Sequence, residues 1–235
     1  MAKITRERFD TRNDVFDQFT HRNLFKLSSQ GHFVELQSPI SIGKEANLFT
    51  ASTKGRPVVV KIYRLQTADF NRMYEYLRTD PRFLNTKRQR RQVIFSWCKR
   101  EYRNLFKARA AGVRVPTPHA FLHNILVMEH IGEYEPAPKV KDQFPLDPQD
   151  FCQKITLAVQ KLYRAGLAHG DLSMFNILND REEPVLIDFS QCTPLSDPNA
   201  AKLLQRDAKN LTTLYTKIGV PTTAAQLQAI IEKKE

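Results

Sequence analysis

The chain has 235 residues, and its 36 Lys and Arg against 25 Asp and Glu give a formal net charge of +11. With 41% hydrophobic and 10% aromatic residues it can bury a core, which excludes an intrinsically disordered chain. Three cysteines outside any CxxC pair exclude a disulfide scaffold. Because no apolar run reaches the ~18 residues of a membrane span and no apolar signal segment opens the chain, we expect a soluble, cytoplasmic protein without membrane contact.

Positive charge is concentrated in the first half of the chain. Residues 1–120 hold 24 Lys and Arg and 10 Asp and Glu, a balance of +14, whereas residues 121–235 hold 12 and 15, a balance of −3. The densest stretch, residues 82–103, has eight basic side chains and one acidic one. Such a stretch is typical of a surface that binds RNA or nucleotide phosphates, and equally of a solvated helix face, so composition leaves both open.

The elements expected in chain order are a helix, a group of strands, and then mainly helices. A first helix is predicted over about residues 13–30, strands near 33–41, 46–52 and 57–63, a helix over about 90–111, and a buried strand at 124–131. Two proline-rich segments, 115–120 and 133–148, are predicted as connections. Asp147-Pro148 and Asp197-Pro198 each predict the start of a helix, and a last short helix follows Thr223.

The segment HGDLSMFNIL (169–178), followed by LIDFSQ (186–191), is the strongest indication of chemistry. The tight turn between them predicts a hairpin that returns Asp188 close to Asn176. Their carboxylate and amide oxygens are hard donors that suit Mg²⁺ on a nucleotide. Asp171 is then available to orient an attacking hydroxyl or to accept its proton.

A second segment, SPISIGKEANLF (38–49) followed by PVVVKIY (57–63), has the layout of a kinase nucleotide cleft, with a glycine turn and then a lysine on the third strand. Lys61 is predicted to point to the nucleotide phosphates. A buried lysine needs an acidic partner, and Glu101, in an otherwise basic helix, is the candidate. Because Gly43 is the only glycine of the loop, the loop by itself also fits an ordinary β-turn.

These motifs resemble those of the RIO-family atypical serine/threonine protein kinases, of the branch without an N-terminal winged helix. SIGKEANLF is similar to that family's STGKEANVY phosphate loop, HGDLSMFNIL resembles its HADLSEYNIL, and LIDFSQ resembles its IIDVSQ. The likeness runs from about Asp14 to about Val220. It implies an α+β, two-lobed kinase-like fold with a nucleotide cleft between an N-lobe (33–130), preceded by a helical extension (1–32), and a reduced, mainly helical C-lobe (131–235).

The resemblance also implies ATP and Mg²⁺, with Mn²⁺ as an alternative ion, and a role for each matching residue. Asp171 is implied as the catalytic aspartate, Asn176 and Asp188 as metal ligands, and Lys61 with Glu101 as the pair that positions the phosphates. The phosphate loop would consist of Ser41, Ile42, Gly43, Lys44, Glu45 and Ala46, and the adenine contacts of Met128, Glu129 and Ile131. Family knowledge further implies that Asp188 can take up the γ-phosphate as an aspartyl phosphate.

The chain departs from the family's pattern at several positions. Ile42 stands where a Thr is usual, and Met174 and Phe175 replace Glu-Tyr in the catalytic loop. The sequences HGD (169–171) and DFS (188–190), in place of the family's HAD and DVS, are closer to the motifs of small-molecule phosphotransferases. His169 is expected to brace the loop by hydrogen bonds rather than to act as a base. Only 47 residues follow Asp188, too few for the activation segment and peptide-docking helices of an ordinary protein kinase.

The leading expectation is an ATP- and Mg²⁺-dependent serine/threonine kinase that acts on a protein substrate or on itself. The alternative is a RIO-type ATPase switch in small ribosomal subunit assembly, which binds ribosomal RNA or the pre-ribosomal small subunit through residues 82–103. A small-molecule phosphotransferase is a third reading of the same motifs. A catalytically inactive binding module is disfavoured because Lys61, Glu101, Asp171, Asn176 and Asp188 are all present.

Overall fold

The structure is a computed structural model and describes residues 17–66 and 68–233 of the chain. It divides into two compact units. Of the described residues, unit 1 comprises those up to residue 77 together with 85–102 and 117–130, and unit 2 comprises 78–84, 103–116 and 131–233. Helix α3 (Arg90–Ala110) therefore contributes residues 90–102 to unit 1 and residues 103–110 to unit 2.

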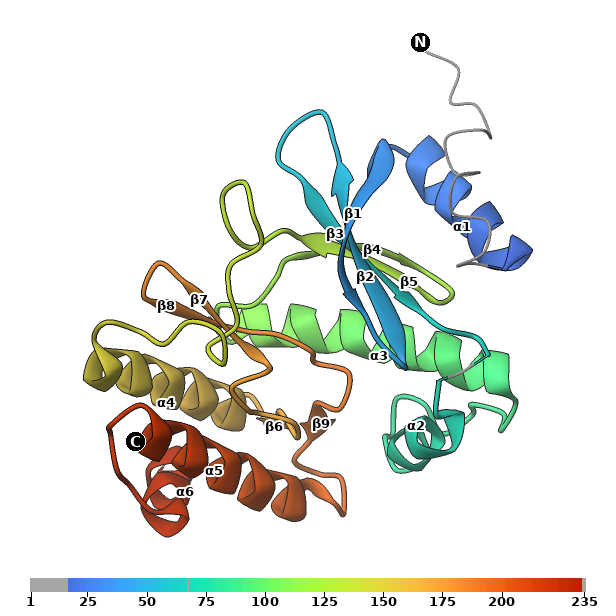
Figure 1. The fold of residues 1–235 in the computed structure, drawn as a ribbon. Helices are drawn as coiled ribbons and strands as arrows, with labels where there is room; N and C mark the ends of the chain where they lie inside the picture. The colour runs from blue at the N-terminus through green and yellow to red at the C-terminus, as the bar shows by residue number, and fades with distance from the viewer. Residues whose placement is uncertain (1–16, 67, 234–235) are drawn as a thin grey trace. The chain divides into compact units, whose positions relative to one another are not determined.

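Unit 1 is an antiparallel five-stranded sheet with order β1-β2-β3-β5-β4, accompanied by helices (Figure 1). The strands are β1 (Glu35–Ile42), β2 (Ala46–Ser52), β3 (Val58–Tyr63), β4 (Pro118–Leu122) and β5 (Ile125–Glu129). Helix α1 (Gln18–Ser29) begins where the Asp17 side chain accepts a 2.8 Å hydrogen bond from Thr20 N. The predicted residues 13–16 of this helix lie outside the described residues. Helix α2 (Phe70–Leu77), which the sequence reading did not include, precedes α3.

The centre of the sheet explains why a lysine can be buried in it. Every residue of β3 is buried, as the run VVVKIY predicts for a central strand covered on both faces. Side chains of α1, β1, β2, β3, β5 and the segment between α1 and β1 form one core cluster: Leu24, Leu27, Phe33, Leu36, Phe49, Ala51, Val58, Val60, Ile62, Ile125 and Val127. Lys61 is thus held on a rigid, fully packed strand.

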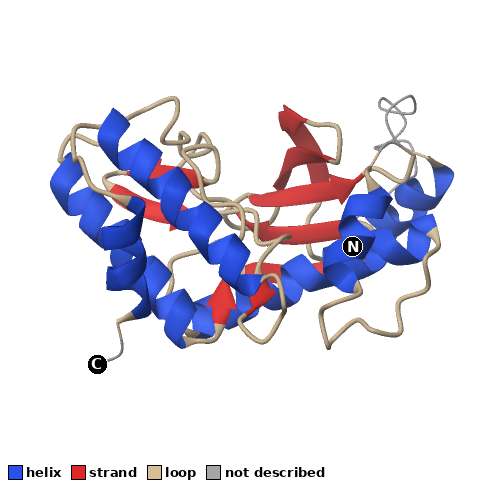
Figure 2. Ribbon diagram, turned by 90° about the horizontal axis from the view of Figure 1, so that it is seen from below, coloured by secondary structure: helices blue, strands red, loops and turns tan. Residues whose placement is uncertain are grey.

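The proline-rich segment 115–120 was predicted as a connection, but the structure shows that part of it is a strand. Its second half enters β4, which pairs with β5 alone and forms one edge of the sheet. Pro118 is the first residue of this strand, and an edge position tolerates a residue that cannot donate a backbone hydrogen bond. The strands of the sheet are red in Figure 2.

Unit 2 is mainly helical. Its helices are α4 (Pro148–Arg164), α5 (Ala200–Lys217) and α6 (Ala224–Glu232), and α6 packs against both others (Figure 1). Two short pairings, β6 (Leu167–Ala168) with β9 (Thr193–Pro194) and β7 (Ile177–Asp180) with β8 (Glu183–Leu186), complete it. Within the described ranges, none of the helices is both long and apolar enough to cross a membrane.

The predicted starts of the three helices in unit 2 are confirmed, with one shift. Asp147 caps α4 through a bond from Asp150 N, and Thr223 forms a reciprocal capping box at α6. Helix α5 begins two residues later than Asp197-Pro198 suggests, after the N-cap Asn199. The reason is that Asp197 Oδ1 accepts from Asn199 N at 2.8 Å, a turn that precedes the helix.

Candidate functional site

The loop between β6 and β7 holds Asp171 and Asn176 in contact. Asn176 Nδ2 donates to the backbone oxygen of Asp171 at 2.8 Å and to its Oδ2 at 3.2 Å. Because the amide nitrogen faces Asp171, the amide oxygen of Asn176 faces away from it. The loop therefore presents a carboxylate and an amide oxygen in fixed relation to one another.

The β7–β8 hairpin brings Asp188 to the same place. Arg181 and Glu182 form its turn with φ of 56° and 68°, as a two-residue hairpin turn requires. At the open end, Ile187 N donates to Asn176 O at 3.0 Å, so the next residue, Asp188, lies beside Asn176. This predicted return of the chain is confirmed. Asp188 has a left-handed φ of 62°, and its Oδ1 accepts a 2.8 Å bond from Ser190 Oγ.

His169 connects the loop between β6 and β7 to the end of this hairpin by hydrogen bonds. Its Nδ1 accepts from Asp171 N at 3.3 Å, and its Nε2 lies 3.1 Å from Ile187 O, a geometry that suits a neutral ring protonated at Nε2. Burial lowers the pKa of His169 to about 4, although the Asp188 charge acts in the opposite direction. At neutral pH the imidazole is thus uncharged, and the prediction that it braces the loop is confirmed.

Asp207 of α5 holds the same loop from the other side, and sequence reasoning did not find it. Its carboxylate accepts from Gly170 N at 2.7 Å and from Leu172 N at 2.9 Å. Burial raises the pKa of Asp207 to about 7, while these two backbone donors lower it. A signal existed in the sequence: Asp207 lies on the inward face of α5, three residues after Leu204 and four before Leu211, where an acid needs a partner.

In unit 1, Lys61 and Glu101 form the ion pair that the sequence predicted. Lys61 Nζ lies 2.8 Å from Glu101 Oε1, and both side chains are buried. The hydroxyl of Tyr63 donates to the second oxygen, Oε2. Glu101 is therefore held by two groups from the same strand, and each member of the buried pair has a partner of opposite charge.

The predicted phosphate loop is the turn between β1 and β2, and an unpredicted arginine braces it. Gly43 N donates to Ala46 O at 3.1 Å, and a Cβ at Gly43 would come within 2.9 Å of that oxygen. Arg64 donates from Nη1 to Gly43 O at 3.2 Å and from its backbone N to Glu45 O at 2.9 Å. Ser41 and Ile42 end β1, and Lys44 lies in the turn itself. Arg64 belongs to no recognisable motif, and the only sequence feature that could have predicted its role is its position directly after β3.

The residues predicted to contact adenine lie at and after the end of β5. Met128 and Glu129 are its last two residues, and Ile131 O accepts from Ala137 N at 2.8 Å. The Glu129 carboxylate accepts from Thr117 N and Oγ1 at 2.9 and 2.6 Å. The Glu129 side chain is thus used within the sheet, while the contact of these residues with a base stays a prediction.

The donors present fit a nucleotide-bound Mg²⁺ better than a cation held by protein alone. In the described part of the chain, no group of three or more His, Cys, Asp or Glu side chains is arranged to hold a metal ion. Asn176 and Asp188 supply one amide and one carboxylate oxygen. Mg²⁺ bound through one or two such groups takes its remaining ligands from phosphates and water.

Comparison with known proteins identifies the family of this chain. The family described as "RIO domain" matches residues 47–228. The chain is 37% identical over 231 residues to the RIO-type serine/threonine-protein kinase Rio1 of Haloferax volcanii, which covers 97% of this chain and 80% of that protein. It is 39% identical to the kinase of the same name from Methanocaldococcus jannaschii, over 97% of this chain and 79% of the relative.

Solved structures show the same fold. The Rio2 kinase of Chaetomium thermophilum superposes with a TM-score of 0.67 at 22% identity, over 90% of this chain and 67% of that one. Its ADP/Mg²⁺-phosphoaspartate complex gives 0.63 at 23% identity, over 91% and 70%. At these identities the likeness carries the fold alone, and it confirms the predicted α+β kinase-like architecture. With the family match and the archaeal relatives, it follows that this chain belongs to the RIO family of protein kinases.

Proposed function

We propose that this kinase transfers the γ-phosphate of ATP, in a Mg²⁺-dependent reaction, to a serine or threonine hydroxyl of a protein or of itself. The observation that carries the proposal is the convergence of Asp171, Asn176 and Asp188 in unit 2. The catalytic loop and the hairpin are joined by the bonds from Asn176 Nδ2 to Asp171 and from Ile187 N to Asn176 O. Two potential metal ligands and one potential base are thus held together.

In this reaction each group has a distinct task. Asp171 orients the acceptor hydroxyl and accepts its proton as the hydroxyl oxygen bonds to the γ-phosphorus and the bond to the β,γ-bridging oxygen breaks. Asn176 and Asp188 would hold Mg²⁺, which when bound neutralises charge on the phosphates. ADP is the leaving group. Lys61, which pairs with the Glu101 carboxylate, would bind the phosphates electrostatically.

A second candidate is an ATPase in which Asp188 itself is the phosphate acceptor. The related Chaetomium structure is titled as an ADP/Mg²⁺-phosphoaspartate complex. In this chain the corresponding step would join an Asp188 carboxylate oxygen to the γ-phosphorus, release ADP, and end with hydrolysis of the acyl phosphate by water. Such a cycle would suit the expected role in small ribosomal subunit assembly, with RNA bound through residues 82–103.

One labelling experiment distinguishes the two candidates. The fate of γ-labelled phosphate is followed over one turnover in wild type, Asp171→Asn and Asp188→Ala, with Glu35→Gln, an exposed acid at the start of β1, as the control. For the kinase, label appears on Ser or Thr of an added protein or of the enzyme, and Asp171→Asn lowers the rate by about 10²–10⁴. A hydroxylamine-sensitive label on the enzyme, or free phosphate alone, favours the ATPase. Undiminished turnover in Asp188→Ala would overturn both.

A further inference from the structure

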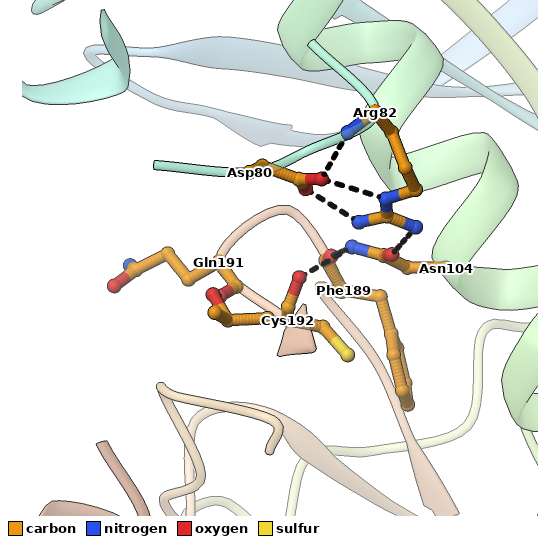
Figure 3. Close-up of polar contacts among 7 residues, drawn as sticks. Asp80, Arg82, Asn104, Phe189, Gln191 and Cys192 are labelled. Atoms are coloured by element: carbon orange, nitrogen blue, oxygen red, sulfur yellow. Dashed lines mark hydrogen bonds and ion pairs between the residues drawn. The ribbon is translucent and has the colours of Figure 1, made fainter. Parts of the chain in front are cut away.

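The turn that follows Asp188 is held by a side chain from α3. Asn104, which is completely buried, donates from Nδ2 to Phe189 O at 2.9 Å and to Cys192 O at 2.7 Å (Figure 3). Cys192 N in turn donates to Phe189 O at 3.2 Å. One amide group thus holds both ends of the turn 189–192 through their carbonyl oxygens.

The Asn104 amide is itself oriented by an ion pair between Arg82, which is partly exposed, and the buried Asp80. Arg82 Nη1 donates to Asn104 Oδ1 at 2.9 Å, while Arg82 Nε and Nη2 donate to the two carboxylate oxygens of Asp80 at 2.9 and 2.6 Å (Figure 3). Asp80 is completely buried. Because a guanidinium group can only donate, the Asn104 oxygen must face Arg82 and its nitrogen must face the turn.

This anchor bears on Asp188 because of the backbone conformation there. A φ of 62° is unfavourable for a residue with a side chain and persists only where the flanking structure enforces it. On the upstream side, the bond from Ile187 N to Asn176 O fixes the chain. On the downstream side, Asn104 fixes the carbonyl of the very next residue, Phe189.

We propose that Asn104, oriented by the Asp80–Arg82 pair, is a positioning residue that holds Asp188 in its left-handed conformation, with its carboxylate beside Asn176. The inference rests on the proposed function, in which Asp188 is a Mg²⁺ ligand. It assigns the segment 78–84 a role: this piece of chain belongs to unit 2 and supplies the orienting pair. All of the residues concerned lie within that unit.

The test is the variant Asn104→Asp. It keeps the size of the side chain and an acceptor for Arg82, but it turns a carboxylate oxygen instead of a donor towards two carbonyl oxygens. Loss of a group that orients a metal ligand typically weakens metal binding about ten- to hundredfold, so the Mg²⁺ concentration for half-maximal turnover should rise by that factor. At saturating Mg²⁺, the Km for ATP of Asn104→Asp should stay within about twofold of the wild-type value, because the variant does not alter the groups that bind the nucleotide itself.

A second readout needs no turnover. In the nucleotide-free protein, the amides of residues 186–194 should exchange hydrogen faster in Asn104→Asp than in wild type, whereas Asn104→Gln, which retains a donor and an acceptor, should exchange at a rate between them. The matched control is Gln160→Glu, the same amide-to-carboxylate change at another position of unit 2. Gln160 of α4 also donates from its side-chain amide to a backbone oxygen, that of Ile230 in α6 at 2.8 Å, instead of to the turn 189–192. It should change neither the Mg²⁺ dependence nor this exchange.

The outcomes separate the inference from the function on which it rests. Wild-type Mg²⁺ dependence and exchange in a folded Asn104→Asp, with Asp188→Ala inactive, would overturn the positioning role alone. Full turnover in Asp188→Ala would instead overturn the metal assignment. If Asn104→Asp does not fold, Arg82→Gln, which removes the orienting charge and leaves Asn104 in place, is measured by the same two readouts, and unchanged values there overturn the inference.

Discussion

Asp207 accepts at Oδ2 a hydrogen bond of 2.7 Å from the backbone N–H of Gly170, the residue directly before Asp171. Its other oxygen accepts from Leu172 N, directly after Asp171. One carboxylate of α5 therefore holds the backbone on both sides of the proposed catalytic residue. Gly170 has a φ of 80°, and a Cβ there would come within 3.1 Å of Gln191 O, so the loop also requires glycine at this position.

Replacing Asp207 by alanine should destabilise the whole protein. The change leaves two buried backbone N–H groups without an acceptor, and each such group costs about 1–3 kcal/mol, so we expect the free energy of unfolding to fall by about 2–4 kcal/mol. Urea denaturation measures this loss. Asp142→Ala, an exposed carboxylate of the same unit, is the control. Equal denaturation midpoints for Asp207→Ala and wild type would show that the two bonds contribute nothing.

Asp207 and His169 should give opposite dependences of stability on pH. The pKa of His169 is about 4 in the folded chain and 6.5 when unfolded, so the unfolded state binds the extra proton and stability is lost as pH falls from 6.5 towards 4, by about 3 kcal/mol. The pKa of Asp207 is about 7 folded and 3.8 unfolded. Here the folded state binds the extra proton, and stability is lost as pH rises from 3.8 towards 7, by about 4 kcal/mol.

In the wild type these two contributions largely cancel between pH 4.5 and 6.5, and single substitutions should reveal them. His169→Asn should lose stability as pH rises through this window, because only Asp207 then titrates. Asp207→Asn should lose stability as pH falls, because only His169 remains. Urea midpoints at several pH values test both slopes. Parallel curves for wild type and the two variants would contradict the assigned pKa directions.

The Lys61–Glu101 pair should show strong coupling in a double-mutant cycle. Either Lys61→Met or Glu101→Leu leaves one charge buried without its partner, at a cost of about 3–5 kcal/mol. The double variant removes both charges and should cost less than the sum of the two single changes. Thermal or urea unfolding of all four proteins measures the coupling. Additive losses would mean that the two charges do not interact.

Arg64 should affect nucleotide binding more than stability. Its guanidinium bond to Gly43 O is lost in Arg64→Met, and a single hydrogen bond of about 1 kcal/mol corresponds to a rise in the Km for ATP of about fivefold. The midpoint of unfolding should hardly change. Arg56→Met, an arginine in the loop between β2 and β3, is the matched control and should leave the Km unchanged. An equal rise in both variants would point to a general charge effect.

Several basic side chains of residues 82–103 are used within the fold, which reduces the number that could contact RNA. Arg100 is completely buried against Tyr76 and Trp97, and Arg82 is paired with Asp80. Neither belongs to an exposed basic surface. Arg90 also donates to the backbone oxygens of residues 66 and 68, so its substitution would disturb the fold as well as the charge.

Arg88 and Arg91 are exposed, and their guanidinium groups contact other side chains instead of the backbone: Arg88 donates to Asn71 Oδ1 at 3.2 Å and lies over the ring of Tyr74, and Arg91 lies over the ring of Phe19. We choose these two arginines for neutralisation. If both contact RNA phosphates, the double change to Gln should reduce the slope of log binding constant against log salt concentration by about 1.5. Lys202→Gln with Lys209→Gln, exposed on α5, removes the same charge elsewhere and should leave the slope unchanged. If the two double variants give the same salt-dependence slope, Arg88 and Arg91 do not contact RNA and are only solvent-exposed residues.

Local sequence patterns were sufficient to predict several helix starts, the β7–β8 hairpin and the buried ion pair of this protein. The hairpin between Asn176 and Asp188 follows from a turn of four residues, and the helix starts at Asp147 and Thr223 follow from capping rules. The pairing of Lys61 with Glu101 could also be predicted, because a buried lysine needs an acidic partner and Glu101 is the one acidic residue in the sequence of α3. Each of these inferences depends on residues close in sequence or on a charge that must be compensated.

Only the tertiary structure decided which side chains hold the site in place. Asp207 reaches Gly170 across 37 residues, and Asn104 reaches Phe189 across 85. Hydrophobic periodicity shows which face of a helix is buried, but it does not show which backbone groups lie opposite that face. The helical pattern places Asp207 on the inward face of α5, and a buried polar group must find partners. Which donors it finds, Gly170 N and Leu172 N, depends on how α5 packs against the loop between β6 and β7.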